Sequence, residues 1–141
     1  SLQALANELG VAPDFLLRNA RSDDQSADGQ IARAGTHPKL DLEDKGISKE
    51  IVTPAMAKDL DLCRALIQPG GSSGEQWFST DKGEQVGVIL QGTLELWIDN
   101  KVVTLHPGDS FCYSSQTPRR WRNPGSTVTE VIWAISNIHT N

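Results

Sequence analysis

The hydrophobic residues repeat with one period in the first part of the chain and with another period in the rest. Residues 1–17 are expected to be helical, because the leucines at positions 2, 5 and 9 have the spacing of one face of an amphipathic helix. The stretch 18–29 contains Asn, Ser, Asp, Gln and Gly and almost no apolar residue, and its composition predicts a linker. From about residue 30 onward the period changes to two, which is typical of half-buried strands. The pattern therefore predicts a helical segment, a linker and a β domain at 30–141.

Short strands separated by turn residues characterise this β domain. Apolar and polar residues alternate at 93–98, and the last apolar strand is expected at 128–135. Asp99 and Asn100 tolerate positive φ, so they predict a tight hairpin turn before the apolar residues at 101–105. The regular spacing of turns favours a closed or sandwiched antiparallel sheet.

Composition and charge exclude some classes of function. The net charge of −5 disfavours general nucleic-acid binding by this part of the protein. No apolar run approaches the ~20 residues that a membrane span requires, and no basic and then apolar leader is visible at the start. We therefore expect a cytoplasmic protein with no membrane partner.

Two segments resemble the paired motifs of the cupin family. Residues 83–96, GEQVGVILQGTLEL, are similar to the first cupin motif, in which a strand ends at a Gly turn. Residues 105–111, LHPGDSF, and then 117–123, TPRRWRN, are similar to the second motif with its Pro-Gly-Asp turn. The resemblance covers residues 66–136 and implies an all-β fold, the cupin double-stranded β-helix, which is a small jelly-roll barrel. A short N-terminal helical remnant would precede the barrel.

The first segment resembles another family. SLQALANELGV followed by APDFLL is similar to the end of a lambda-repressor-like (XRE-type) helix-turn-helix domain. That domain closes with a leucine-rich helix, a Gly-Val turn and a short Leu-Leu helix. The resemblance implies that residues 1–17 end a DNA-binding domain whose recognition helix lies upstream of this sequence. An unrelated amphipathic extension is the alternative.

The cupin motifs also locate a site inside the barrel. Cupins that bind a metal use two His, a Glu and a third His. The resemblance places these four ligand positions, none of which keeps its usual residue, at Ser79, Asp81, Gln85 and Arg119. A guanidinium stays charged and cannot ligate a metal. We therefore expect no metal, no other cofactor and no catalytic residue, and so a protein that is not an enzyme.

The same positions suit a bound small molecule. The fork of Arg119 can bind a carboxylate or phosphate through two parallel hydrogen bonds. Trp121 lies two positions further along the strand, so it faces the same side and offers an apolar wall. Ser79, Asp81 and Gln85 would add polar contacts. The alternative is that Arg119 pairs with Asp81 and fills the former metal position with an internal ion pair.

Together the two resemblances imply the effector-sensing cupin domain of a transcriptional regulator. A small molecule in the barrel would alter DNA binding by the upstream helix-turn-helix domain, and paired recognition helices imply a homodimer. Two other functions stay open, namely a cupin enzyme of isomerase or oxygenase type and a ligand-free dimerisation module. A metal-free enzyme would need a base in the barrel, and among the motif positions Asp81 is the candidate.

Overall fold

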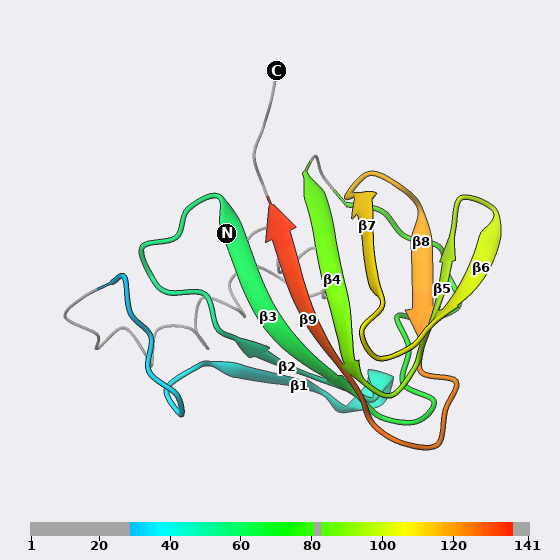
Figure 1. Cartoon of the computed structure of the whole chain (residues 1–141), viewed down its shortest axis with the longest axis horizontal. Helices are drawn as coiled ribbons and strands as arrows, with labels where there is room; N and C mark the ends of the chain where they lie inside the picture. The colour runs from blue at the N-terminus through cyan, green and yellow to red at the C-terminus, as the bar shows by residue number, and fades with distance from the viewer. Residues whose placement is uncertain (1–28, 81–82, 137–141) are drawn as a thin grey trace.

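Two antiparallel sheets form the computed structural model of the chain, which describes residues 29–80 and 83–136. The larger sheet has six strands in the order β1-β2-β3-β9-β4-β7, and the smaller has three in the order β6-β5-β8 (Figure 1). The strands are β1 Lys39–Leu42, β2 Ile47–Ile51, β3 Leu60–Ile67, β4 Glu84–Gln91, β5 Leu94–Ile98, β6 Lys101–Leu105, β7 Ser110–Ser114, β8 Arg119–Arg122 and β9 Thr129–Ser136. One short 3-10 helix, η2 (Glu43–Lys45), links β1 to β2. The all-β prediction is confirmed.

The predicted helical segment at 1–17 lies outside the described residues, as does the predicted linker except for residue 29. Within the described ranges, no helix is long and apolar enough to cross a membrane.

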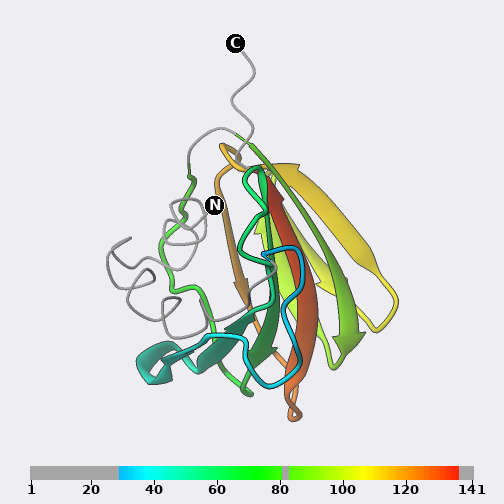
Figure 2. The same ribbon diagram turned by 90° about the vertical axis from the view of Figure 1, so that its left-hand side faces the viewer.

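The two sheets curve around a shared interior (Figure 2), which buried hydrophobic residues fill. Burial alternates strictly along β2 and β9, because every second side chain of a strand points to the same face. The buried hydrophobic residues come from strands of both sheets. They are Leu40, Ile47, Ile51, Cys63, Ala65, Ile67, Ile89, Leu94, Leu96, Ile98, Tyr113, Trp121, Val131, Trp133 and Ile135.

The predicted hairpin between β5 and β6 is confirmed. Asp99 and Asn100 have φ angles of 51° and 61°, which is the left-handed pair that a two-residue turn needs. The register then aligns Leu94 with Leu105 and Ile98 with Lys101. The turn thereby fixes which face of β5 points into the barrel.

Strand register stacks the inward-facing residues of the large sheet into layers. The first layer, at one end of the barrel, is mostly polar and contains Asp61, Ile135, Gln85 and Tyr113. The second contains two aromatic residues, Trp133 and Phe111, together with Cys63 and Gly87. The third is aliphatic except for one lysine and contains Leu40, Lys49, Ala65, Val131 and Ile89. The polarity of the interior therefore changes along the barrel.

Gly87 makes room for the aromatic layer. A Cβ atom at this position would lie 2.3 Å from Cζ of Phe111, so only glycine leaves space for that ring. The Phe111 ring then meets Trp133 edge-on at a centroid distance of 5.3 Å. This geometry suits the opposite charges of a ring edge and a ring face.

Candidate functional site

Arg119 stands at the polar end of the barrel. It begins β8 and is completely buried. Its Nη1 donates hydrogen bonds to the carbonyl oxygens of Ser115 (2.9 Å) and Thr117 (3.1 Å). Its guanidinium carbon lies 4.7 Å from the ring centroid of Phe78 and 4.6 Å from that of Tyr113. Two rings and two carbonyls thus hold the cation in one orientation, and each ring contributes a favourable cation–π contact.

Gln85 connects the polar layer to the aromatic layer. Its Oε1 accepts a hydrogen bond of 3.0 Å from the indole Nε1 of Trp133. Its Nε2 lies 3.5 Å from Oγ of Ser115, the residue whose carbonyl also binds Arg119. The amide is therefore oriented by its neighbours, with the oxygen toward the tryptophan and the nitrogen toward the serine.

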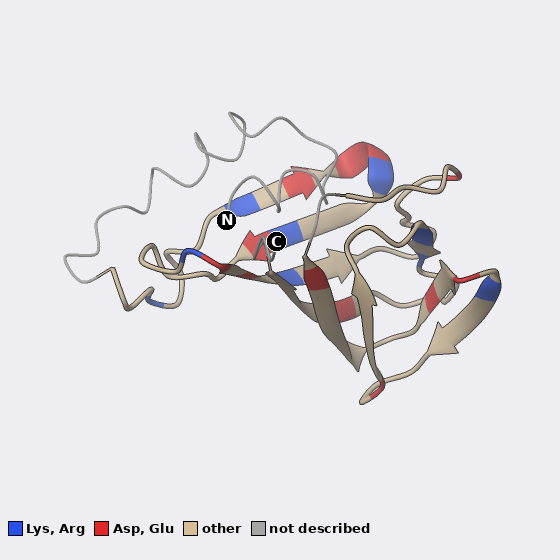
Figure 3. Cartoon of the chain, turned by 90° about the horizontal axis from the view of Figure 1, so that it is seen from above, with Lys and Arg blue, Asp and Glu red and all other residues tan. Residues whose placement is uncertain are grey.

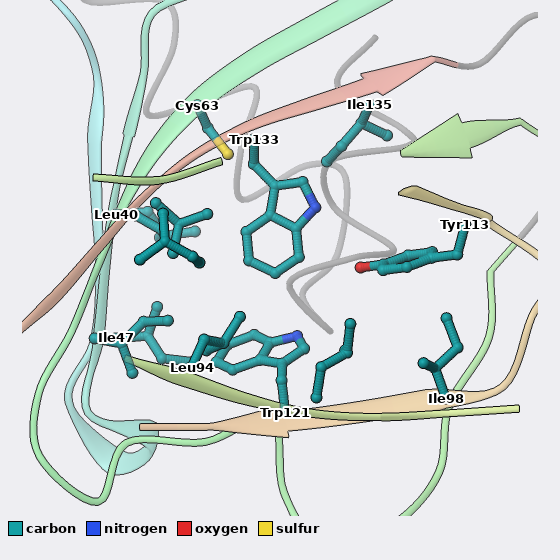
Figure 4. Packing of buried hydrophobic residues seen from close by; sticks show 14 of the residues in the cluster. Leu40, Ile47, Cys63, Leu94, Ile98, Tyr113, Trp121, Trp133 and Ile135 are labelled. Atoms are coloured by element: carbon teal, nitrogen blue, oxygen red, sulfur yellow. The ribbon is translucent and has the colours of Figure 1, made fainter. Parts of the chain in front are cut away.

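Two tryptophans form the wall beyond this polar end. Trp121 on β8 and Trp133 on β9 are both buried, and their ring centroids are 5.6 Å apart. Both indole nitrogens turn toward the side on which the Tyr113 hydroxyl lies (Figure 4). Within the described residues, Nε1 of Trp121 has no hydrogen-bond acceptor. The wall therefore offers a polar edge as well as an apolar face.

Lys49 is buried deeper in the barrel. It lies in the middle of β2, and only 1% of its surface is exposed. Its Nζ lies 5.1 Å from the ring centroid of Trp133 and has no hydrogen-bond partner in the described part of the chain. A buried amine in such a setting is rare, because charged groups in an interior are normally paired.

Asp61 completes the polar layer. It is buried on β3, and the register places it two strands away from Gln85, with Ile135 of β9 between them. Burial raises the pKa of the Asp61 carboxyl above its ordinary value, because an apolar environment disfavours the ionised form. A carboxyl with a raised pKa inside a barrel is a candidate for proton transfer.

A family model for the cupin domain, Cupin_2, matches residues 63–135, which is just over half of the chain. The chain belongs to this family. The match includes β4 and β8, which carry Gln85 and Arg119, so the layered interior described above is the interior of a cupin barrel.

Several solved structures share this cupin fold. One is the Cupin_2 domain of an XRE family transcriptional regulator from Enterobacter cloacae, with 20% identity, a TM-score of 0.60, and coverage of 67% of this chain and 99% of that chain. Another is KdgF from Halomonas sp., with 21% identity, a TM-score of 0.61, and coverage of 75% and 92%. A third is a sugar phosphate isomerase of the cupin superfamily from Silicibacter pomeroyi, with 16% identity, a TM-score of 0.57, and coverage of 72% and 76%. No curated protein sequence gives a match.

The prediction that the chain is not an enzyme is wrong as it stands. The same fold serves a sugar phosphate isomerase as well as a regulator, so an enzymatic function is plausible for this cupin. The prediction rested on the lost metal ligands and on Asp81 as the sole candidate base. The structure adds Asp61 and Lys49 to the barrel interior, and both are groups that can exchange protons.

The structure brings together three of the five predicted site residues. Gln85, Arg119 and Trp121 all face the cupin interior. Ser79 is exposed and lies outside the strands, so the rule that i and i+2 share a face does not hold there. Phe78, its neighbour, forms an isolated bridge with Arg119 and covers the guanidinium instead. Asp81 lies outside the described residues.

Sequence reasoning missed Lys49 and Asp61, although both follow the period of two. Lys49 lies between Ile47 and Ile51 at inward spacing, and Asp61 precedes Cys63 at the same spacing. Charged residues at such positions are usually assigned to solvent, which hides them from a motif search.

The described residues at the cupin ligand positions do not fit a transition metal. The guanidinium of Arg119 has no lone pair to donate, and the side-chain oxygen of Gln85 already accepts the Trp133 indole proton. In residues 29–80 and 83–136, no group of three or more His, Cys, Asp or Glu is placed to hold a metal ion.

Proposed function

We propose that this cupin barrel binds a small-molecule effector and that the chain is the sensing domain of a cytoplasmic DNA-binding regulator. The observation that carries the proposal is the polar layer around Arg119 and Gln85, which is enclosed by the barrel and backed by Trp121. Ligand sites in proteins are typically apolar cavities with a few oriented polar groups. The fixed guanidinium favours an effector that carries a carboxylate or phosphate.

The regulator role has separate support. The sequence before the barrel resembles the end of a helix-turn-helix domain, and one solved neighbour is the cupin domain of an XRE family regulator. Basic and acidic residues are interspersed over the described part of the chain (Figure 3). This mixed charge does not favour DNA contact by the barrel itself, so the proposal assigns the contact to a helix-turn-helix domain, and a homodimer would present two such domains to a two-fold operator.

Effector binding would act by shifting a population. If the effector binds one mutual arrangement of two subunits more tightly, that arrangement becomes more populated, and the DNA affinity changes by the same free energy. In this mechanism the effector contacts the barrel differently in the two arrangements, and the paired DNA-binding domains change their DNA affinity as a result.

A thermal-shift screen of the purified chain tests ligand binding. The panel contains small carboxylates, sugar acids, sugar phosphates and neutral sugars. At ~100 times its dissociation constant, a true ligand stabilises the fold by about 2.7 kcal/mol. We expect at least one compound to raise the melting temperature of the wild type, and Arg119→Lys, which keeps the charge but loses the planar fork, to weaken the effect. If no compound stabilises the chain, the sensor proposal fails.

A second candidate is a metal-independent cupin isomerase, and Asp61 is the observation that favours it. The raised pKa of Asp61 and its place in the same interior layer as Gln85 suit a general acid or base. Incubation with sugar phosphates, followed by NMR detection of isomers, tests this activity. Turnover that disappears in Asp61→Asn while the fold survives would favour the enzyme over the sensor.

A further inference from the structure

The outward face of the large sheet is apolar where such a face is usually polar. An antiparallel sheet with one face in water alternates apolar and polar residues, whereas a strand that is buried on both faces is a nearly continuous apolar run. Residues 86–90 of β4 and 131–135 of β9 are runs of the second kind. The barrel covers only one face of these strands, so their other face lacks a partner that the sequence pattern implies.

Strand register gathers the outward apolar residues into one patch. Two neighbouring rows cross β3, β9, β4 and β7, which lie side by side (Figure 1). This outer patch consists of Leu62, Ala134, Val86 and Cys112 in one row and of Ile132 and Val88 in the next. Leu62 is 39% exposed and Val86 is 48% exposed. The patch carries no charged residue.

The charged groups beside the outer patch form a polar rim. Arg64 on β3 donates a hydrogen bond from Nη1 to Oε1 of Glu50 (3.3 Å) and another from Nε to Glu130. Oε2 of Glu50 also lies 3.0 Å from Nδ1 of His37. Glu84, at the start of β4, borders the patch at the other end of the strands. An apolar centre with a polar rim is the usual anatomy of a protein interface, and the paired charges would keep their partners if the patch were covered.

The outward face of the small sheet differs. Trp97 lies on this face, and the guanidinium carbons of Arg120 and Arg122 lie 4.3 Å and 5.8 Å from its ring centroid. Arg122 also donates a hydrogen bond of 2.7 Å from Nε to Oε1 of Glu95. The largest apolar side chain of the small sheet is therefore capped by cations of the sheet itself, whereas the outer patch of the large sheet has no such cap.

The size of the large sheet suits a second copy of the chain. Six strands of about six residues each present a face of roughly 600 Å2, at a strand spacing of ~4.8 Å and a rise of ~3.4 Å per residue. A stable interface buries about 800 Å2 on each partner, which this face and its rim can supply. A two-fold contact uses the same patch on both subunits, so one contact removes both apolar faces from water.

We propose that the outer patch is the interface of a homodimer in which the large sheets of two copies of this chain pack face to face. The inference deepens the proposed function, on which it rests for the need of two subunits, by naming the surface through which they meet. It also connects the effector site to that surface. β4 carries Gln85 on its inner face and Val86 on its outer face, so a shift of this strand on effector binding moves the interface as well.

Sedimentation velocity of the whole chain at a series of concentrations tests the interface. We expect the wild type to dimerise, and Val86→Asp to raise the dimer dissociation constant by at least ~100-fold, because the interface would bury a carboxylate without a partner. Val102→Asp is the matched control, since Val102 lies on the outward face of β6 in the small sheet and is 52% exposed. It should leave the dissociation constant unchanged. Circular dichroism checks that both variants fold.

The thiol of Cys112 gives a second measurement that needs no substitution. Cys112 is exposed within the outer patch, whereas Cys63, the other cysteine of the chain, is completely buried. The rate at which a maleimide labels Cys112 should therefore fall as the wild type is concentrated and dimerises, because labelling requires an accessible thiol. In Val86→Asp the rate should stay constant over the same concentrations.

Three results would overturn the proposal. One is a dimer that Val86→Asp weakens no more than Val102→Asp does. Another is a labelling rate of Cys112 that stays constant while the wild type dimerises. The third is a chain that is monomeric at every concentration, which would leave the outer patch to a different partner. The thiol measurement decides the question if Val86→Asp does not fold. The thermal screen tests effector binding separately, so a ligand that stabilises a chain without this dimer would overturn the inference and leave the effector site standing.

Discussion

Replacing Lys49 by methionine should make the ligand-free protein more stable. An unsatisfied buried donor costs about 1–3 kcal/mol, and more when it is charged. The Nζ of Lys49 lies 5.1 Å from the Trp133 centroid, and a desolvated cation–π contact of this kind returns up to about 2 kcal/mol. Methionine keeps the length of the stem and its contact with the aromatic ring. We therefore expect a net gain of about 1 kcal/mol for Lys49→Met.

Thermal and urea unfolding of the ligand-free chain measure this gain. For a chain of 141 residues, 1 kcal/mol corresponds to a rise of roughly 3–5 °C in melting temperature. Lys39→Met should shift it by less than about 1 °C, because exposed substitutions are usually near neutral. A loss of more than about 1 kcal/mol in Lys49→Met would refute the reasoning, since it would mean that the amine stabilises the empty barrel.

Three further substitutions follow from the same interior. Gln85→Leu removes the acceptor of the Trp133 indole hydrogen bond and should lower the free energy of unfolding in urea by about 1–3 kcal/mol. Gln85→Glu keeps an acceptor and should lower it by less. Equal losses in the two variants would contradict the role of this hydrogen bond. Gly87→Ala forces the Phe111 ring to move and should cost about 1–3 kcal/mol, so an unchanged urea midpoint would show that the ring adapts freely. Folding raises the pKa of Asp61 above 3.8, so the folded protein holds this proton more tightly than the unfolded chain does. The contribution of Asp61 to the free energy of unfolding is therefore fully present below that pH and is lost as the pH rises through the folded pKa. Asp61→Asn should flatten this part of the stability profile measured in urea at several pH values, and an unaltered profile would refute the assignment.

The period of two predicted the barrel well because it reports burial directly. The apolar run at 128–135 predicted the last strand near its observed bounds of Thr129–Ser136, and the turn preference of Asp99 and Asn100 predicted the β5–β6 hairpin. The period of two placed Arg119 and Trp121 on the same face, and the cupin resemblance predicted that this face points inward. In each case the side-chain period and the local turn preference agree with the final fold, so the local sequence was sufficient.

The site was only partly predictable because it depends on contacts between distant strands. The motif assigned Ser79 to the interior, but in the structure the chain there has left the strand geometry and Phe78 faces the guanidinium. Lys49 lies outside both motifs, and it reaches the site only through the pairing of β2 with β3. Asp61 depends in the same way on the register of β3 against β9. Such pairings are not encoded in the spacing of one segment.

A crystal structure of the chain, grown with the best compound from the thermal screen, tests the central claim most directly. The account predicts ligand density inside the barrel, in contact with Arg119 or Gln85 at the polar end and with Trp121 at the aromatic wall. An interior filled by side chains alone, with the compound absent at saturating concentration, would contradict a ligand-binding barrel and favour a dimerisation scaffold.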